Sequence, residues 1–190
     1  MLERSDKFKI KEKYEEAIGV CEGILAIDPN CTEAYEEIGD NYISLRKLAK
    51  AEKALAQALK INPQSANAAY LSGFMESCRR NWKRSISFLE KADEFKPNHP
   101  EILRCLGWSH AMNGNYNHGI ILLERAKTLS PDDVYILTDL GVCYLNNKNI
   151  AKALPIFHRV IEIDPSNRKA RECLLIVEEY AAKSRKLKRK

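Results

Sequence analysis

The stretch YEEAIGVCEGILAIDPN at residues 14–30 decides how this chain folds, because it returns in altered form further along. LAKAEKALAQALKINPQ follows at 48–64 and IAKALPIFHRVIEIDPS at 150–166. In each stretch apolar residues recur at spacings of three and four, which predicts an amphipathic helix. Each stretch also ends beside a proline, which lacks an amide donor and disfavours the α conformation in the residue before it. Each predicted helix therefore ends where its proline turns the chain.

The copies follow a fixed period of 34 residues, and no insertion breaks the register. A fixed period of this length is typical of a solenoid, in which stacked copies bury one another's apolar faces. Glycines and other small residues recur with the same period, which predicts places where two helices cross closely. The recurring residues are Pro29, Pro63, Pro97, Pro131 and Pro165; Gly39, Gly73, Gly107 and Gly141; and Ala17, Ala51, Ser85, Gly119 and Ala153.

Each unit is predicted to contain two helices. In the unit 32–65 the first helix begins at Thr32 and ends near Leu45. After a polar turn, the second helix extends from about Leu48 to about Ile61. The sequence thus predicts an all-α fold, a right-handed superhelical solenoid of about eleven helices in antiparallel pairs, without strands.

The residues at these phases resemble one repeat family. In the unit 32–65 they are Tyr35, Ile38, Gly39, Tyr42, Ala51, Leu55, Ala58 and Pro63, and in the unit 134–167 they are Leu137, Leu140, Gly141, Tyr144, Ala153, Phe157, Val160 and Pro165. This pattern resembles the tetratricopeptide repeat, a helix–turn–helix of 34 residues. The unit 66–99 departs from it, because Ala69, Ser72 and Glu76 replace the usual large residue, leucine and tyrosine.

The resemblance implies one solenoid over residues 1–182, with five repeats and a C-terminal capping helix. The last eight residues hold six of the basic side chains, and without them the 31 basic residues fall to 25 against 26 acidic ones. The basic character therefore belongs to the tail. The segments are a truncated repeat at 1–31, complete repeats at 32–65, 66–99, 100–133 and 134–167, a capping helix at 168–182 and a basic tail at 183–190.

Composition points to a cytoplasmic protein. None of the six cysteines forms a C-x-x-C pair, and none has a histidine at metal-ligand spacing, so we expect free thiols in a reducing compartment. The N-terminus, MLERSDKFKIKE, shows no apolar segment of a secretory signal, and the aliphatic run at 174–177 is too short to span a bilayer. A basic terminus such as 183–190 is most often a solvated end, so binding of nucleic acid or an anionic membrane through it is not expected.

The sequence offers no catalytic constellation. No phosphate-binding, dinucleotide-binding, metalloprotease or nucleophile-elbow motif is present. His110 falls at a phase usually held by an interior tyrosine, which favours a partly buried structural histidine over a base. We therefore predict that the chain is not an enzyme and binds no metal and no cofactor. Pro155 lies inside the second helix predicted for the unit 134–167, where it should bend or delay that helix. The favoured interpretation is a tolerated first-turn proline, because the helix begins near Ile150.

Proteins of the family bind peptides or other proteins in a concave groove lined by the first helix of each repeat. The second, fifth, ninth and twelfth residues of each unit lie on one stripe of that helix. The candidate groove residues are Glu36, Asp40, Tyr70, Phe74, Glu101, Arg104, Trp108, Tyr135, Thr138 and Val142. The alternative is that Phe74 and Trp108 only pack between adjacent first helices.

The resemblance implies a non-catalytic interaction scaffold or adaptor that binds a partner peptide or helix, with aromatic contacts dominating and Arg104 available to fork onto an acidic group. The alternative is an accessory region of a larger enzyme or of a secretion or assembly machine. A second copy of the chain is an alternative partner. One subclass grips chaperone C-termini with lysines, asparagines and an arginine, but the matching positions here are Glu36, Asp40, Leu71, Glu101 and Cys105, so this clamp is not expected.

Overall fold

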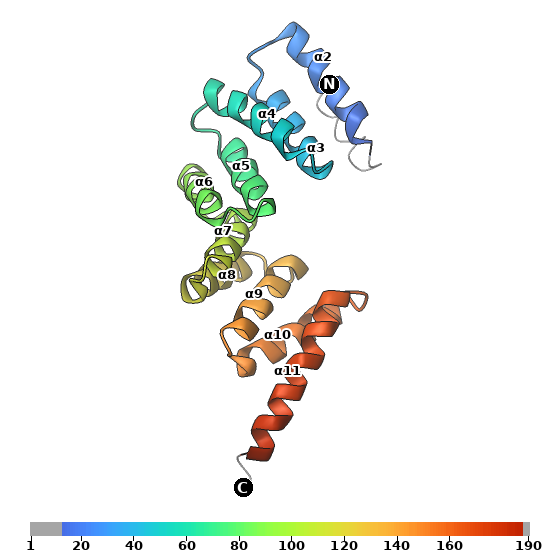
Figure 1. The fold of residues 1–190 in the computed structure, drawn as a ribbon, viewed down its shortest axis with the longest axis vertical. Helices are drawn as coiled ribbons and strands as arrows, with labels where there is room; N and C mark the ends of the chain where they lie inside the picture. The colour runs from blue at the N-terminus through green and yellow to red at the C-terminus, as the bar shows by residue number, and fades with distance from the viewer. Residues whose placement is uncertain (1–12, 188–190) are drawn as a thin grey trace. The chain divides into compact units, whose positions relative to one another are not determined.

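A computed structural model of the chain describes residues 13–187, with side chains described through residue 180 (Figure 1). This part of the chain contains ten α-helices and no strand, which confirms the prediction of an all-α helical solenoid. The start of the predicted truncated repeat, residues 1–12, lies outside the described residues. The helices are α2 (Tyr14–Ile27), α3 (Thr32–Ser44), α4 (Leu48–Ile61), α5 (Ala66–Cys78), α6 (Trp82–Phe95), α7 (Pro100–Met112), α8 (Tyr116–Leu129), α9 (Val134–Asn146), α10 (Ile150–Ile163) and α11 (Arg168–Leu187).

The prolines end the second helices as the sequence predicts. Asn62 precedes Pro63 and has extended backbone angles, with φ −125° and ψ 93°. Asp164 precedes Pro165 and has nearly the same angles, φ −127° and ψ 88°. A residue before proline avoids the α region because the proline ring would collide with its backbone. This local effect sets the C-terminal boundaries of α4 and α10.

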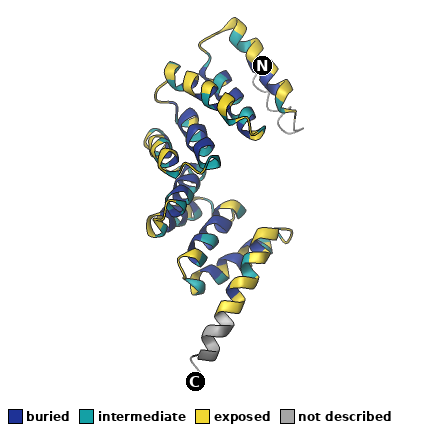
Figure 2. Cartoon of the chain, in the orientation of Figure 1, coloured by how far each residue is buried: buried dark blue, intermediate teal, exposed yellow. Residues whose placement is uncertain are grey.

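The chain divides into two compact units, residues 1–97 and 98–190. In the first unit α3 packs on α2 and α4, and α5 packs on α4 and α6. In the second unit α7 packs on α8, α9 packs on α8 and α10, and α10 also packs on α11. Buried residues, dark blue in Figure 2, occur along the helices of both units. One continuous solenoid over 1–182 stays a prediction.

Glycine lies where the two helices of a repeat cross, as predicted. A Cβ on Gly39 would lie 2.6 Å from the Leu55 side chain, and a Cβ on Gly73 would lie 2.5 Å from Leu89. In the second unit a Cβ on Gly107 would lie 2.8 Å from the carbonyl oxygen of Gly119. Real Cβ atoms do not approach neighbours this closely, so a side chain at these positions would force the facing atoms to shift. At Gly107 the facing atom belongs to the backbone and cannot rotate away.

Ser85 shows how a small polar residue is accommodated at such a crossing. It occupies the same phase as Gly119 in the next repeat. Its hydroxyl donates to the carbonyl oxygen of Gly73 at 2.8 Å, and its side chain is fully buried. The hydroxyl is therefore satisfied in an apolar crossing, where an unpaired one would be costly.

The turn between the two helices of each repeat requires a left-handed residue. Four residues spaced by 34 hold this position, with φ of 58° at Arg46, 59° at Arg80, 94° at Gly114 and 59° at Lys148. After α3, the amide of Arg46 donates to the carbonyl of Ile43 and the next amide donates to the carbonyl of Tyr42. These two bonds define a Schellman motif, which usually has glycine at this position. Three of the four turns therefore carry a side chain in a strained conformation.

Replacing Arg46, Arg80 and Lys148 with glycine is expected to raise the free energy of unfolding by about 1 kcal/mol per site, since relief of the left-handed strain outweighs the added freedom of the unfolded chain. All three side chains are exposed. Urea unfolding of each single variant and of the triple variant measures the effect. Gly114→Arg is the matched control and should lose a similar amount. Equal stability of the triple variant and the parent chain would contradict the claim of strain.

Pro155 corrects one prediction from the sequence. The helix α10 begins at Ile150 as expected, but Pro155 is its sixth residue and lies in the second turn, so the first-turn interpretation is wrong. Proline there removes one backbone hydrogen bond, the one to the carbonyl of Ala151. Both residues are exposed, so water can hydrate that carbonyl, and the helix continues to Ile163.

The C-terminal helix is longer than predicted. It extends from Arg168 to Leu187, five residues beyond the expected end at 182, and thus includes part of the predicted basic tail. Ala170 and Val177 are fully buried. Leu175 occupies the phase that is glycine in the four complete repeats, and 68% of it is exposed. None of the helices that the structure describes has the length and apolarity needed to cross a membrane.

Candidate partner-binding surface

A charged and aromatic surface lies on the first helices of the second unit. On α7, the guanidinium of Arg104 grips Glu101, with Nε 2.9 Å from Oε2 and Nη2 2.6 Å from Oε1. Its remaining nitrogen, Nη1, donates to Oδ2 of Asp139 on α9 at 2.7 Å. The planar fork of the arginine is therefore already occupied by two carboxylates. Arg104 joins α7 to α9 and does not present a vacant fork to a partner.

Two aromatic rings flank this ion-pair network. The ring of Tyr135 has the guanidinium carbon of Arg104 5.9 Å from its centroid. The ring of Trp108 on α7 has Nζ of Lys169 5.1 Å from its centroid, although Lys169 belongs to α11. The same Nζ lies 3.9 Å from Oδ1 of Asp139. The first helices of the second unit therefore bring aromatic faces and charges together on one surface, which we call the aromatic–ionic surface.

The predicted residues on this surface differ in their access to solvent. Tyr135 is 73% exposed, although it is a large aromatic residue. Trp108 and Val142 are partly buried and pack against the apolar core of the second unit. Thr138 is buried, and its hydroxyl donates to the carbonyl of Val134 at 2.6 Å. Among the six predicted residues of this unit, Tyr135 is the most accessible.

The four predicted residues of the first unit form a separate set. Glu36 is only 8% exposed, and its two carboxylate oxygens accept hydrogen bonds from the hydroxyl of Ser65 and from Nδ2 of Asn67 at 2.8 Å. It therefore connects α3 to the start of α5. Tyr70 and Phe74 stack on α5 with centroids 6.3 Å apart and rings inclined by 15°. Both are partly buried against the core of this unit, and Asp40 on α3 is also half-buried.

Burial sets the protonation behaviour of several groups here. Desolvation raises the pKa of Asp139 above its usual range, although the nearby Arg104 opposes the shift. Burial also raises the pKa of Cys105 and of Cys143 to about 12. Only a thiolate is a strong nucleophile or metal ligand. These two thiols are therefore protonated near neutral pH and act as packing groups.

Two observations concern histidines and possible metal ligands in the described part of the chain. His110 is half-buried as expected, and its ring meets that of His118 edge to face with centroids 4.4 Å apart. In residues 13–187 no group of three or more histidine, cysteine, aspartate or glutamate side chains is arranged to hold a metal ion.

Two members of the aromatic–ionic surface, Lys169 and Asp139, were not predicted from the sequence. Lys169 is the second residue of the segment that begins at Arg168, and Tyr135 is the second residue of the repeat 134–167. Lys169 therefore lies on the same stripe one period later. Extending the stripe into the capping helix finds it. Asp139 is the sixth residue of the repeat 134–167 and lies just outside the stripe. Its role depends on the neighbouring helix, which a one-helix pattern does not describe.

Comparison with protein families and solved structures agrees with this architecture. Profiles described as tetratricopeptide repeat match residues 10–73 and 134–167, which together make up just over half of the sequence. The chain belongs to the tetratricopeptide repeat family. A search of curated proteins gives no match.

Solved structures with the same fold share little sequence with this chain. The crystal structure of MamA is 21% identical with a TM-score of 0.70, over 87% of this chain and 96% of that one. YrrB, described as a TPR protein with an unusual peptide-binding site, is 20% identical with a TM-score of 0.69, over 88% and 87%. The protein pilF of Pseudomonas aeruginosa is 11% identical with a TM-score of 0.84, over 95% and 82%. At these identities the likeness concerns the fold.

Proposed function

We propose that the chain is a non-catalytic interaction scaffold that binds a peptide or helix of a partner protein on the aromatic–ionic surface. The proposal rests on the exposure of Tyr135. Its side chain is 73% exposed beside Arg104, which Glu101 and Asp139 hold in place. An exposed aromatic ring on a rigid support gives a large contact area at little cost in conformational entropy. Membership of a family of interaction repeats supports the same class of function.

The charges suggest how a partner would be oriented. The fork of Arg104 is occupied by carboxylates, so Arg104 supports the surface and does not itself capture an acidic group of the partner. Lys169 is about half exposed and lies beside both Trp108 and Asp139. Its ammonium group can turn toward a partner carboxylate while the indole accepts an apolar side chain. The preferred ligand is then an apolar or aromatic segment that has an acidic residue at the end that lies beside Trp108.

The first unit contributes a second aromatic patch. The stacked rings of Tyr70 and Phe74 are partly exposed on α5, and Asp40 is half-buried on the preceding first helix. We propose that this patch binds a partner segment of its own within the first unit. Glu36 is a structural acceptor in this proposal, so replacing it should affect stability before affinity.

The test begins with a twelve-residue peptide selected from a displayed library against the full chain, with affinity measured by fluorescence anisotropy. Tyr135→Ala is expected to weaken binding by about 1–2 kcal/mol, roughly tenfold, with little loss of stability because the ring is exposed. Trp108→Ala is expected to cost about 2 kcal/mol or more in affinity. It should also lower stability, since the indole packs on the core.

Ile121→Ala is the matched control, because Ile121 is also in the second unit, is 63% exposed and lies on the second helix α8. It should leave the affinity unchanged. If Ile121→Ala weakens binding as much as Tyr135→Ala, the partner occupies another face and the proposal fails. Unchanged affinity for both Tyr135→Ala and Trp108→Ala has the same meaning.

A further inference from the structure

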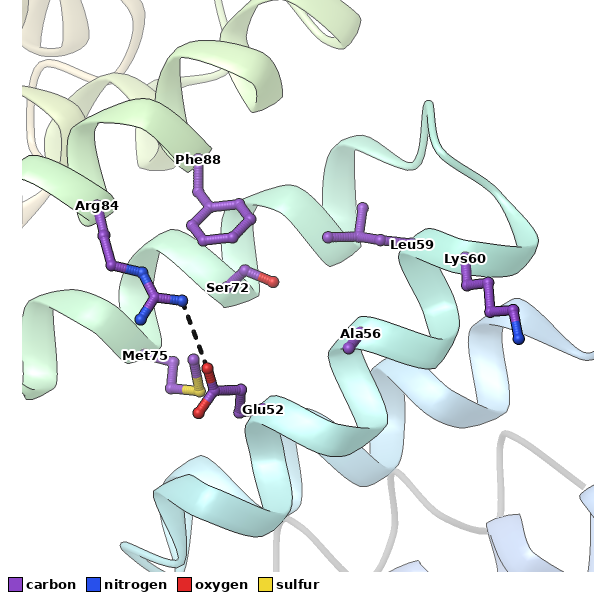
Figure 3. Close-up of a pocket in the computed structure, with 8 residues that line it drawn as sticks. All are labelled: Glu52, Ala56, Leu59, Lys60, Ser72, Met75, Arg84 and Phe88. Carbon is purple, nitrogen blue, oxygen red and sulfur yellow. Dashed lines mark hydrogen bonds and ion pairs between the residues drawn. The ribbon is translucent and has the colours of Figure 1, made fainter.

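The first unit contains a cavity of about 340 Å³ on the side of the second helices, formed entirely by α4, α5 and α6 (Figure 3). Its walls are largely apolar and its rim is charged. Figure 3 shows Phe88 and Ser72 facing the space from one side and the side chain of Leu59 pointing into it from α4. The lining residues are Glu52, Ala56, Leu59, Lys60, Ser72, Met75, Arg84 and Phe88.

The cavity exists because this repeat has lost side-chain volume. Ser72 occupies a phase that holds Ile38, Leu106 and Leu140 in the other complete repeats. Leu106 and Leu140 are buried in the second unit, so the equivalent space there is filled. The hydroxyl of Ser72 donates to the carbonyl of Ala68 within its own helix at 2.7 Å, and so it adds no contact between helices. Ser72 therefore lines the space that a leucine side chain would occupy at this phase.

A second substitution relative to the other repeats makes the rim polar. Glu52 occupies the phase of Ile18, Ile86 and Ile120. Thus a carboxylate stands where three other repeats place an isoleucine and the last repeat places Leu154. A purely apolar gap would be a packing defect, but this combination of apolar wall and charged rim is typical of a ligand site.

The rim carries a net positive charge. Glu52 accepts hydrogen bonds from Arg79 at 2.8 Å and from Arg84 at 3.4 Å, and the hydrogen bond from Arg79 is the main cause of its lowered pKa. The same two arginines also pair with Glu76, whose side chain is fully buried, at 3.2 Å and 3.4 Å. Among the residues that line the cavity, Lys60 and Arg84 are cations and Glu52 is the one carboxylate. The group that such a rim favours is an anion.

The cavity is independent of the stripe that carries Tyr70 and Phe74. Ser72 is two residues from each of them on α5, which places it about 200° around the helix. A ligand in the cavity therefore approaches from the opposite side of α5.

We propose that this cavity is a second binding site, which takes one large aliphatic or aromatic side chain of a partner segment together with an adjacent acidic residue. A volume of about 340 Å³ lies at the small end of the range for ligand pockets, about 300–1,000 Å³, and suits a side chain better than a whole helix. Leu59, Met75 and Phe88 supply apolar contact for the side chain. Lys60, which is exposed at the rim, supplies the contact for the acid. Arg84, which is half exposed and pairs with Glu52 and Glu76 at 3.4 Å, adds positive charge beside it.

The experiment is an amide chemical-shift titration of the full chain with blocked hexapeptides. The first peptide has Leu-Phe between two pairs of glutamates, the second has Leu-Phe between two pairs of lysines, and the third has Ala-Ala between two pairs of glutamates. The first is expected to shift amides around Ser72, Met75 and Phe88 and to bind at least tenfold more tightly than the other two. Equal affinity of all three peptides, or shifts confined to other residues, would overturn the proposal.

Two variants fix the location of binding. Ser72→Leu restores the residue that the neighbouring repeats carry and is expected to abolish the shifts while raising Tm. Arg84→Glu leaves the cavity open and is expected to weaken the glutamate peptide about tenfold and to strengthen the lysine peptide. Undiminished binding of the glutamate peptide to either variant would refute the assignment.

Phe74→Ala is the matched control on the other face of the same helix. It is expected to leave the hexapeptide shifts unchanged, although a partner that uses Tyr70 and Phe74 would bind less tightly. If Phe74→Ala removes the hexapeptide binding as well, the peptide occupies the stripe and the second site is rejected. The outcome for the cavity is thus separable from the outcome for the patch formed by Tyr70 and Phe74.

Discussion

Gly119→Ala is expected to lower the free energy of unfolding of the second unit by about 3–4 kcal/mol, although it adds a single methyl group. The new Cβ would lie 2.5 Å from the carbonyl oxygen of Gly107 and 3.0 Å from the backbone amide of Ala111. These atoms belong to the backbone of α7, so no side chain can rotate away. The two helices must separate, and the apolar contacts along their crossing are lost.

Tryptophan fluorescence can follow this unit alone, because Trp82 lies in the first unit and Trp108 in the second. In a Trp82→Phe background, urea unfolding of Gly119→Ala is compared with that of Gly19→Ala. A Cβ on Gly19 meets nothing within 4 Å, so that control is expected to gain about 0.5–1 kcal/mol from helix propensity, measured by circular dichroism. A loss below about 1 kcal/mol for Gly119→Ala would mean that the crossing adjusts at little cost.

Gly141→Leu is the second large effect, with an expected loss of about 2–4 kcal/mol. Here the Cβ would lie 2.8 Å from the ring of Phe157, which is fully buried. The obstacle is a side chain, so it can be trimmed. Phe157→Ala alone should cost about 3–5 kcal/mol, but the two substitutions together should cost less than their sum, because leucine fills the space that the ring leaves.

The same unfolding assay measures this double-mutant cycle. Strict additivity of Gly141→Leu and Phe157→Ala would show that the leucine collides with something other than the ring. Gly119→Ala has no corresponding rescue, because its neighbour is a carbonyl oxygen. The contrast separates a backbone contact from a side-chain contact at equivalent crossings of successive repeats.

Much of this fold could be predicted from the sequence, because the signals that set it are local and repeated. Pro63 and Pro165 place the ends of helices, and Gly39 and Gly141 place the crossings. The left-handed turns were not predicted, and at Arg46 nothing in the residue type signals a positive φ. Backbone geometry there is imposed by the flanking helices.

The candidate surface was less predictable, since it depends on pairs of helices. The stripe found Arg104 and Tyr135, but it did not show that Glu101 and Asp139 occupy the guanidinium. The departure at Ser72 was visible in the sequence, whereas the cavity was not, because neighbouring side chains can collapse into lost volume. Only the positions of Leu59 and Phe88 show that the space stays open.

Leu175 has a consequence for engineering longer arrays from this chain. At its phase each complete repeat has a glycine, which admits a second helix at close range. The leucine side chain would keep an added helix further from α11 than the helices of a complete repeat are from each other. A helical hairpin fused after α11 would therefore pack with a larger interhelical distance than the existing repeats. Leu175→Gly is therefore the substitution with which a designer would begin. The existing helix would tolerate it at a cost of about 1 kcal/mol in helix propensity, because Leu175 is 68% exposed.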